Sequence, residues 1–142
     1  MSSKVRHFTD LIVWRKSHDL FLCVLRDWEV GPGSRGRDVV FTQLARSTAS
    51  ISANIAEGFN RSRKRYVNAL DIALGEANEA ENWLYKARDA EYLPADQATE
   101  RLRAIRRIEK MLATLKKKIA DSTQSIREIE EEYTTDHEDH YE

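Results

Sequence analysis

Residues 43–58 read QLARSTASISANIAEG and have the pattern of a helix with almost no charge. Between Val39 and Gly58 only Arg46 and Glu57 are charged, although 33% of the whole chain is charged. Half of the other residues in 43–58 are alanine or serine, whose small side chains let a neighbouring backbone approach closely. A helix without a charged face has to be covered on most of its sides. We therefore expect this segment to pack inside an assembly of helices.

The composition of the whole chain favours a helical protein. Its 142 residues include only two prolines and five glycines, and Ala, Glu, Arg, Lys and Leu are abundant. This length fits one domain with a sizeable core. The single cysteine, Cys23, excludes an internal disulfide and a cysteine-based zinc cluster. No stretch resembles a signal peptide or approaches the ~20 apolar residues that span a bilayer. We expect a soluble, cytoplasmic, all-α protein.

Four helical segments follow from the apolar periodicity and from start and stop signals. We expect them over about 10–28, 37–59, 62–90 and 96–131. The connection GPGSRG, residues 31–36, ends the first of them. Apolar residues alternate at three- and four-residue spacing along the helices, which predicts an antiparallel up-and-down four-helix bundle.

The fourth predicted helix is longer than the first. Its apolar stripe keeps heptad spacing from Ile105 to Tyr133, and at ~1.5 Å per residue a helix over 96–131 is roughly 54 Å long. Its last turns must overhang the bundle, pack on another subunit or fray. The segment DSTQS, residues 121–125, is the natural place for this helix to weaken.

Charge divides the chain into a basic body and an acidic tail. Residues 127–142 contain eight acidic residues and one base, Arg127, whereas residues 1–126 carry a net charge of +6. Residues 134–142 are too polar to form a core, and we expect them to be disordered. We therefore predict a four-helix bundle domain over 8–126, followed by an acidic helix end and disordered tail. The body is compatible with nucleic acid, and the tail is either a solubilising end or an intramolecular competitor for the same surface.

Lines of polar side chains follow the second and third predicted helices at helical spacing. Buried amides and hydroxyls need hydrogen-bond partners, so we expect the two lines to pair with each other. The lines consist of Gln43, Ser47, Ser50, Asn54 and Glu57 on the second helix and of Asn68, Asp71, Gly75, Asn78 and Asn82 on the third.

The solvent face of the second helix would contain four alanines if the protein were a monomer. Alanine is tolerated on a surface, but coverage by another subunit accounts better for the missing charge. We therefore expect a homo-oligomer. The predicted interface residues are Gln43, Ser47, Ser50, Asn54, Glu57 and Asn78.

The chain contains no motif of a catalytic or cofactor site. It has no phosphate-binding loop, no dinucleotide-binding fingerprint and no nucleophile elbow. His18 lies in an apolar stripe and is interpreted as a core or interface histidine, while His137 and His140 give only a weak signal for a divalent metal. Glu81 falls on the same face of the third predicted helix as Leu70, Leu74 and Leu84. We interpret it as a carboxylate that reaches the bundle edge or pairs with a neighbouring arginine. We predict no catalytic residue, no metal site, no cofactor and no enzymatic activity.

Two basic groups are candidates for contacts with nucleic acid. The first consists of Arg61, Arg63, Lys64 and Arg65 at the turn between the second and third helices, with Tyr66 beside it to stack on a base. A basic helix face is usually just a solvated surface. Binding to another protein is therefore kept as the alternative to nucleic-acid binding. The second group lies on the fourth helix and consists of Arg103, Arg106, Arg107, Lys110 and Lys117.

Three segments together resemble a known family. They are FTDLIVWRKSHDLF (8–21), the segment 43–58 and LDIALGEANEAENWLYKARDAEYL (70–93). They are similar, over about residues 8–119, to the four-helix bundle proteins encoded within intervening sequences of large-subunit ribosomal RNA genes. That family is related to the accessory variability proteins of diversity-generating retroelements. The pair Glu76–Ala77 departs from the family pattern, which more often has serine followed by an apolar residue.

The resemblance implies an antiparallel four-helix bundle that assembles as a barrel-like homopentamer. For the retroelement relatives it implies a positively charged surface that binds nucleic acid and a partner reverse transcriptase. Our leading hypothesis is a non-enzymatic oligomer that binds RNA or DNA through Arg61–Arg65 and the basic face of the fourth helix, as an accessory to a reverse transcriptase. The alternative is a structural or adaptor module that binds another protein through the overhanging end of the fourth helix.

Overall fold

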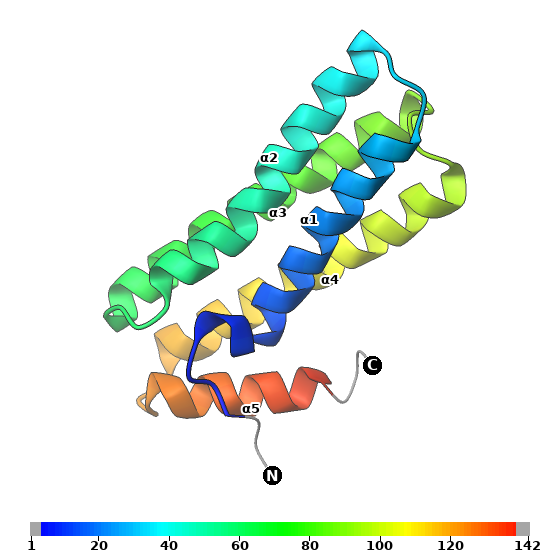
Figure 1. Ribbon diagram of the computed structural model, residues 1–142. Coiled ribbons are helices and arrows are strands. Elements are labelled where there is room, and N and C mark those ends of the chain that lie inside the picture. Colours follow the sequence, from blue (N-terminus) through cyan, green and yellow to red (C-terminus); the bar gives the residue numbers. More distant parts are fainter. Residues whose placement is uncertain (1–3, 139–142) are drawn as a thin grey trace.

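The computed structural model of the chain describes residues 4–138, and these residues form helices and no strand. The predicted all-α class is confirmed. The elements are a short 3₁₀ helix, η1 (Phe8–Asp10), and five α-helices, α1 (Ile12–Val30), α2 (Arg35–Gly58), α3 (Arg63–Asp89), α4 (Ala95–Asp121) and α5 (Ile126–Glu138) (Figure 1).

Helices α1 to α4 lie side by side, and helices that follow each other in the chain run in opposite directions (Figure 1). α2 packs on α1 and on α3, α4 packs on α3, and α1 also contacts α4. The four helices thereby enclose one apolar core. α5 crosses one end of this group, near the start of the chain, and contacts α1 and α4 (Figure 1). Within residues 4–138, no helix combines the length and the apolar content needed to cross a membrane.

Serine side chains mark the starts of α2 and α3. Ser34 Oγ accepts a hydrogen bond from the backbone N–H of Arg37, at 3.1 Å. Ser62 Oγ accepts one from the backbone N–H of Arg65, at 3.3 Å. Each bond satisfies one of the N–H groups that have no partner in the first turn of a helix.

Small residues allow α2 and α3 to approach closely, and this pair makes the most extensive contact between helices. Five alanines of α3 are buried, and Leu44, Ile51 and Ile55 of α2 are completely buried. At the end of α2, a Cβ atom added to Gly58 would lie 2.6 Å from the Cβ atom of Ala69. The glycine at the end of the N-I-A-E-G segment is therefore needed for the space it leaves, not for an unusual backbone angle.

We expect Gly58→Ala to lower the free energy of unfolding by about 1–3 kcal/mol, because the added methyl group overpacks the contact with α3. Gly75 of α3 is the matched control, since an added Cβ there meets no atom within 4 Å. Gly75→Ala should raise the free energy of unfolding by about 0.5–1 kcal/mol through helix propensity. Urea denaturation at low protein concentration measures both changes, and equal effects of the two substitutions would contradict the packing argument.

The prediction of one long fourth helix is wrong, because the segment 96–131 forms parts of two helices. α4 ends at Asp121, and α5 begins after a turn. The break falls in DSTQS, where weakening was predicted. Ser122 Oγ accepts a hydrogen bond from the N–H of Gln124, at 3.0 Å, and Ser125 Oγ accepts one from the N–H of Glu128, at 3.2 Å. Serine side chains that bond to the nearby backbone compete with a continuous helix.

The prediction of disorder from Thr134 onward is wrong for residues 134–138, which complete α5. Tyr133 and Thr134 are completely buried, and Ile129 is 3% exposed. The apolar positions of α5 lie on one face, and docking against α1 and α4 gives that face a partner, which composition alone does not reveal. Residues 139–142 of the predicted tail lie outside the described residues.

Polar contacts also attach α5 to the rest of the protein. The hydroxyl of Tyr66 donates to Glu130 Oε2 at 2.6 Å, and the N–H of Val5 donates to Glu131 Oε2 at 2.9 Å. Arg15 of α1 pairs with Glu138 at the end of α5. Burial raises the pKa of Glu130 to about 7, from an ordinary value of 4.5. The docked position of α5 therefore favours the protonated form of this carboxyl.

We expect the docking of α5 to weaken as the pH rises. A carboxyl with a raised pKa in the folded state contributes stability that is complete below pH 4.5 and is lost as the pH rises through 7. Between pH 6 and pH 8.5, the free energy required to detach α5 from the rest of the protein should fall by about 1 kcal/mol. Amide hydrogen exchange of residues 126–138, corrected for intrinsic rates, measures this change. Glu130→Gln should abolish the dependence, and an equal fall in the variant would contradict this account.

Candidate nucleic-acid interface

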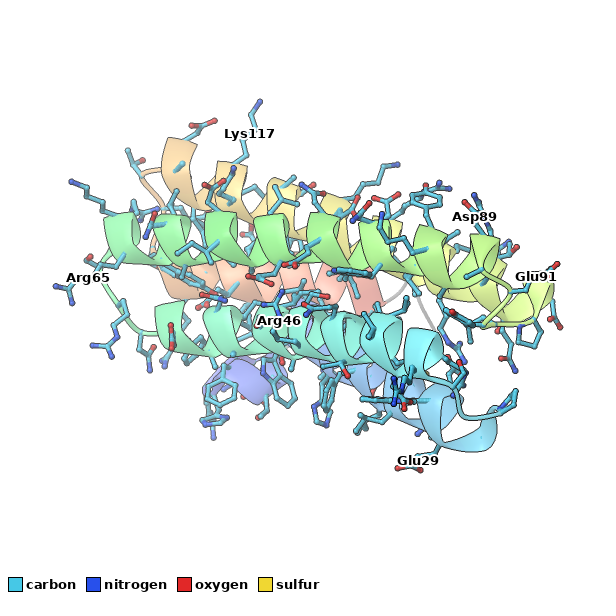
Figure 2. All side chains as sticks on the ribbon, turned by 90° about the horizontal axis from the view of Figure 1, so that it is seen from above. Glu29, Arg46, Arg65, Asp89, Glu91 and Lys117 are labelled. Carbon is cyan, nitrogen blue, oxygen red and sulfur yellow. The ribbon has the colours of Figure 1, made fainter. Side chains whose placement is uncertain are left out.

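The basic group at the turn between α2 and α3 has one member with a structural task. The guanidinium of Arg63 donates hydrogen bonds to the carbonyl oxygens of Ile119, at 2.5 Å, and Gln124, at 2.7 Å. It thereby satisfies backbone carbonyls at the end of α4 and in the turn that follows. Figure 2 shows Arg65 projecting from the start of α3. The exposed members of the group are Arg61, Lys64 and Arg65.

The prediction that Tyr66 stacks on a base is wrong. Its side chain is completely buried, and its hydroxyl donates to Glu130 of α5. Burial and the neighbouring carboxyl raise the pKa of Tyr66 well above its usual value. Because α5 covers this end of α3, the turn between α2 and α3 offers exposed charges but not the aromatic ring of Tyr66.

Other arginines are also used inside the protein. Arg37 is 2% exposed, and its guanidinium donates to the carbonyls of Trp28, at 2.8 Å, and Asp27, at 2.5 Å, at the end of α1. Arg101 forms two hydrogen bonds to the carboxylate of Asp27, at 2.7 and 3.0 Å. The net charge of the basic body therefore overstates the positive charge that faces solvent.

Four of the five basic residues predicted on the fourth helix come together in one groove. Their positions recur at three- and four-residue spacing, which places them on one face of α4. The groove has a volume of about 640 Å³. Lys117 is exposed further along α4, in a separate groove beside α5 (Figure 2). The groove of about 640 Å³ is called the α3–α4 groove below. It is lined by Glu81 of α3 and by Arg103, Arg106, Arg107, Glu109 and Lys110 of α4.

Two carboxyl groups, those of Glu81 and Glu109, lie together in the α3–α4 groove. A hydrogen bond between them would require a proton on one of the two carboxyls. Burial and the neighbouring Glu81 raise the pKa of Glu109 to about 8. Hydrogen bonds from Glu109, Tyr85 and Arg106 lower the pKa of Glu81. At neutral pH the groove therefore contains four positive side chains and one negative side chain.

Arg106 is held by neighbours on α3. Its Nε donates to Glu81 at 3.2 Å, and another nitrogen of its guanidinium donates to the hydroxyl of Tyr85. The interpretation that Glu81 pairs with a neighbouring arginine is confirmed. The side chain of Arg106 is nevertheless 58% exposed. A guanidinium that is fixed on one side and open to solvent suits the two oxygens of a phosphate.

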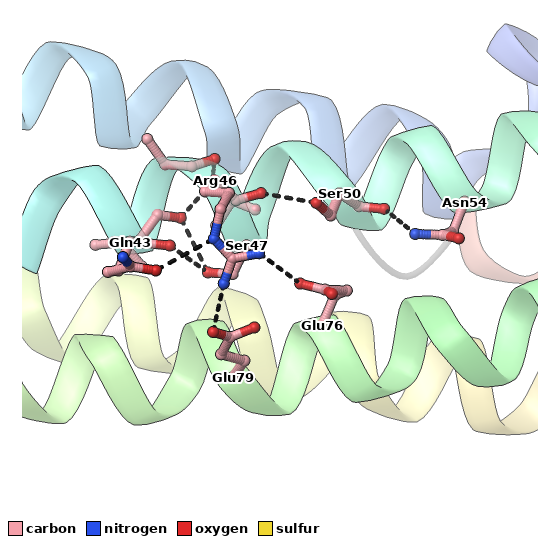
Figure 3. Close-up of polar contacts among 10 residues, drawn as sticks. Gln43, Arg46, Ser47, Ser50, Asn54, Glu76 and Glu79 are labelled. Carbon is pink, nitrogen blue, oxygen red and sulfur yellow. Dashed lines mark hydrogen bonds and ion pairs between the residues drawn. The ribbon is translucent and has the colours of Figure 1, made fainter.

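The residues predicted for the oligomer interface differ in their burial and in their hydrogen-bond partners (Figure 3). Ser47 is completely buried within the chain, and its hydroxyl donates to the carbonyl of Gln43, at 3.0 Å. Ser50 donates to the carbonyl of Arg46, at 2.9 Å, and Asn54 donates to the carbonyl of Ser50, at 2.7 Å. The predicted pairing between two polar lines is wrong for these three side chains, because each bonds to its own helix.

In this region Arg46 links α2 to α3 instead. Arg46 lies between the two helices in Figure 2 and pairs with Glu79, at 2.5 Å, and with Glu76, at 3.9 Å (Figure 3). Glu57 and Asn78 are exposed, and Gln43, Ser50 and Asn54 are partly buried. The exposed surface of α2 and α3 also includes the apolar side chains Val39, at 60% exposure, and Ile72, at 47%.

His18 and His137 both contact aromatic rings. His18 stacks on Trp14, with 4.8 Å between ring centroids, and His137 contacts the ring of Tyr133. His140 lies outside the described residues. In the part of the chain that the structure describes, no three His, Cys, Asp or Glu side chains gather as metal ligands.

The family model of the 23S rRNA-intervening sequence proteins matches residues 9–114. The chain belongs to this family. It is also similar to a protein with unknown function from the S23 ribosomal protein family of Bacteroides thetaiotaomicron, whose crystal structure has been solved. The two chains are 32% identical with a TM-score of 0.69, and the match covers 75% of this chain and 99% of the other. No curated protein matches the chain. The family match ends within α4, so α5 lies outside it.

Proposed function

We propose that this member of the 23S rRNA-intervening sequence protein family is a non-enzymatic protein that binds RNA or DNA through the α3–α4 groove. The observation that carries the proposal is the gathering of Arg103, Arg106, Arg107 and Lys110 in one groove. Four positive side chains against one carboxylate match the charge of a nucleic-acid backbone, whose phosphates dominate affinity. Contacts of this kind position a nucleic acid without reading its sequence.

The exposed charges at the turn between α2 and α3 are a secondary contact in this proposal. Arg61, Lys64 and Arg65 are open to solvent, but Arg63 and Tyr66 are engaged with α4 and α5. The turn therefore offers isolated charges, whereas the α3–α4 groove offers guanidinium groups around a hollow. This difference in shape favours the groove as the main site.

The adaptor alternative is not supported, because the helix end that would dock on a partner does not overhang the protein. It required the end of the fourth helix to overhang the bundle, whereas the chain turns at Ser122 and folds back as α5. The apolar side chains Ile129 and Tyr133, which would have been offered to a partner, are buried against the protein itself.

We further propose that α1 to α4 form the antiparallel up-and-down four-helix bundle of the family and that this bundle assembles as a homopentamer. The alternating directions of the four helices support the first part. The exposed apolar side chains Val39 of α2 and Ile72 of α3, at 60% and 47% exposure, support the second. An accessory role beside a cytoplasmic reverse transcriptase is the biological setting that the retroelement relatives suggest.

Neutralising the groove should weaken binding to every nucleic-acid sequence. Arg103 and Lys110 are exposed, and Arg103→Gln with Lys110→Gln removes two positive charges while leaving the pair of Arg106 and Glu81 intact. We expect at least a tenfold loss of affinity at low salt and a decrease of about two in the slope of log K against log salt. Fluorescence anisotropy with a labelled RNA and with a DNA of the same sequence measures both quantities.

The matched control for this experiment is Lys64→Gln with Arg65→Gln at the turn, which removes the same charge from the other basic group. A smaller loss of affinity is expected for this variant. The reverse order of the two losses would move the site to the turn. If the unchanged protein binds neither RNA nor DNA at low salt, the proposed function is wrong.

A charge on the exposed α2–α3 surface should disrupt the oligomer. Ile72→Glu replaces an exposed apolar side chain of this surface with a carboxylate and should shift the mass in solution toward that of a monomer. Ala113→Glu, on the exposed face of α4, is the control and should leave the mass unchanged. Light scattering at micromolar concentration measures the mass. A wild-type protein that is already monomeric would overturn the oligomer proposal.

A further inference from the structure

The carboxyl pair of the α3–α4 groove lies directly against a candidate phosphate ligand. Glu81 accepts hydrogen bonds from Arg106, at 3.2 Å, and from the hydroxyl of Tyr85, at 2.9 Å, and Glu109 lines the same groove from α4. Glu109 Oε2 is buried and has no N–H or hydroxyl donor among the described residues. A buried carboxyl oxygen without a donor is costly when charged and is tolerated when the group is protonated.

Few charged groups act on Glu109. From α3 it is faced by Glu81, and from its own helix by Arg106. Three further basic residues of α4 line the same groove: Arg103, Arg107 and Lys110. Glu81 is in turn faced by Glu109, Tyr85 and Arg106. The shared proton therefore decides whether Arg106 has one carboxylate or two carboxylates beside it.

We infer that the hydrogen-bonded pair of Glu81 and Glu109 positions Arg106 for a nucleic-acid phosphate, so that binding in the α3–α4 groove depends on the proton that the pair shares. The inference rests on the proposed function. Glu81 and Tyr85 hold one side of the Arg106 guanidinium, and Glu109 keeps Glu81 in place by donating its proton to it. Glu81, Tyr85 and Glu109 are positioning residues in this arrangement, and Arg106 is the residue that contacts the phosphate.

Loss of the proton changes both the charge and the geometry of the groove. Two adjacent carboxylates repel each other, so the side chain of Glu109 moves away from Glu81 and toward Arg106, its nearest positive neighbour. Glu109 then competes with the phosphate for the same guanidinium. The groove also changes from four positive charges against one negative charge to four against two.

The direction of the pH dependence follows from the raised pKa of Glu109, which is about 8. The pair keeps its proton at neutral pH and loses it as the pH rises through 8. Binding should therefore be strongest at and below neutral pH and weaken above it. A bound phosphate adds negative charge beside the pair, so binding near pH 8 should draw a proton from solution.

The experiment measures the affinity of the full chain for a labelled single-stranded RNA between pH 6.5 and pH 9.5, at constant ionic strength. We expect the wild-type affinity to fall about fivefold to tenfold across this range, the size of effect expected for one charge beside a phosphate. Glu109→Gln keeps a hydrogen-bond donor toward Glu81 but has no proton to lose, so its profile should be flat. Circular dichroism checks that both proteins keep their helical content.

Glu130→Gln is the matched control, because Glu130 also has a raised pKa, about 7, but lies on α5, where it accepts a hydrogen bond from Tyr66, and not in the groove. Its pH profile for RNA binding should follow that of the wild type. A second measurement is calorimetry at pH 8 in two buffers of different ionisation enthalpy. Wild-type protein should take up protons on binding RNA, and Glu109→Gln should not.

The outcomes separate the inference from the function on which it rests. If wild type and Glu109→Gln bind RNA with the same pH profile, the inference is overturned and the groove keeps its proposed function. If Glu130→Gln is the variant that flattens the profile, the responsible proton belongs to Glu130 of α5 and the inference is also overturned. If wild-type protein binds no RNA at any pH, the proposed function itself fails.

Discussion

The close approach of α2 to α3 is the constraint on which the rest of the structure depends. It requires small side chains along both helices and no side chain at Gly58, where a Cβ atom would lie 2.6 Å from that of Ala69. Because the two helices meet so closely, Arg46 can pair with Glu76 and Glu79 across them. The position of α3 in turn sets where its carboxyl and hydroxyl groups meet the basic face of α4.

The docking of α5 redistributes the functions of the charged residues. Without α5, the turn between α2 and α3 would offer an aromatic ring beside its basic side chains. With it, Tyr66 donates to Glu130 in a buried contact, while the guanidinium of Arg63 bonds to carbonyls at the end of α4 and in the turn that precedes α5. The segment that lies outside the family match thus covers Tyr66, whereas Arg61, Lys64 and Arg65 stay exposed. Charge that appears equivalent along the chain has different uses in the folded protein.

The α3–α4 groove combines permanent and conditional charge. Arginine stays protonated at any physiological pH, so its contribution to the groove is constant. The pair of Glu81 and Glu109 is different, since two carboxyls in contact cannot both ionise without strong repulsion and one of them lies partly buried. The pair keeps one proton, and Glu81 uses its negative charge to hold Arg106. The groove therefore places a carboxyl pair, whose charge depends on pH, within a surface of permanently charged arginines.

The sequence by itself determined the helical class, the family and the shared face of Arg103, Arg106, Arg107 and Lys110, and it marked DSTQS as the place where the fourth helix weakens. These are local or periodic properties, and a stripe or a turn signal is visible in a short window. Only the tertiary structure decided that the helix breaks after Asp121, that residues 134–138 are helical, that Tyr66 is buried and that Glu81 and Glu109 meet in one groove. Burial and charge pairing join residues far apart in the chain. Their energies depend on which helices meet and how closely, and no spacing along the chain contains that information.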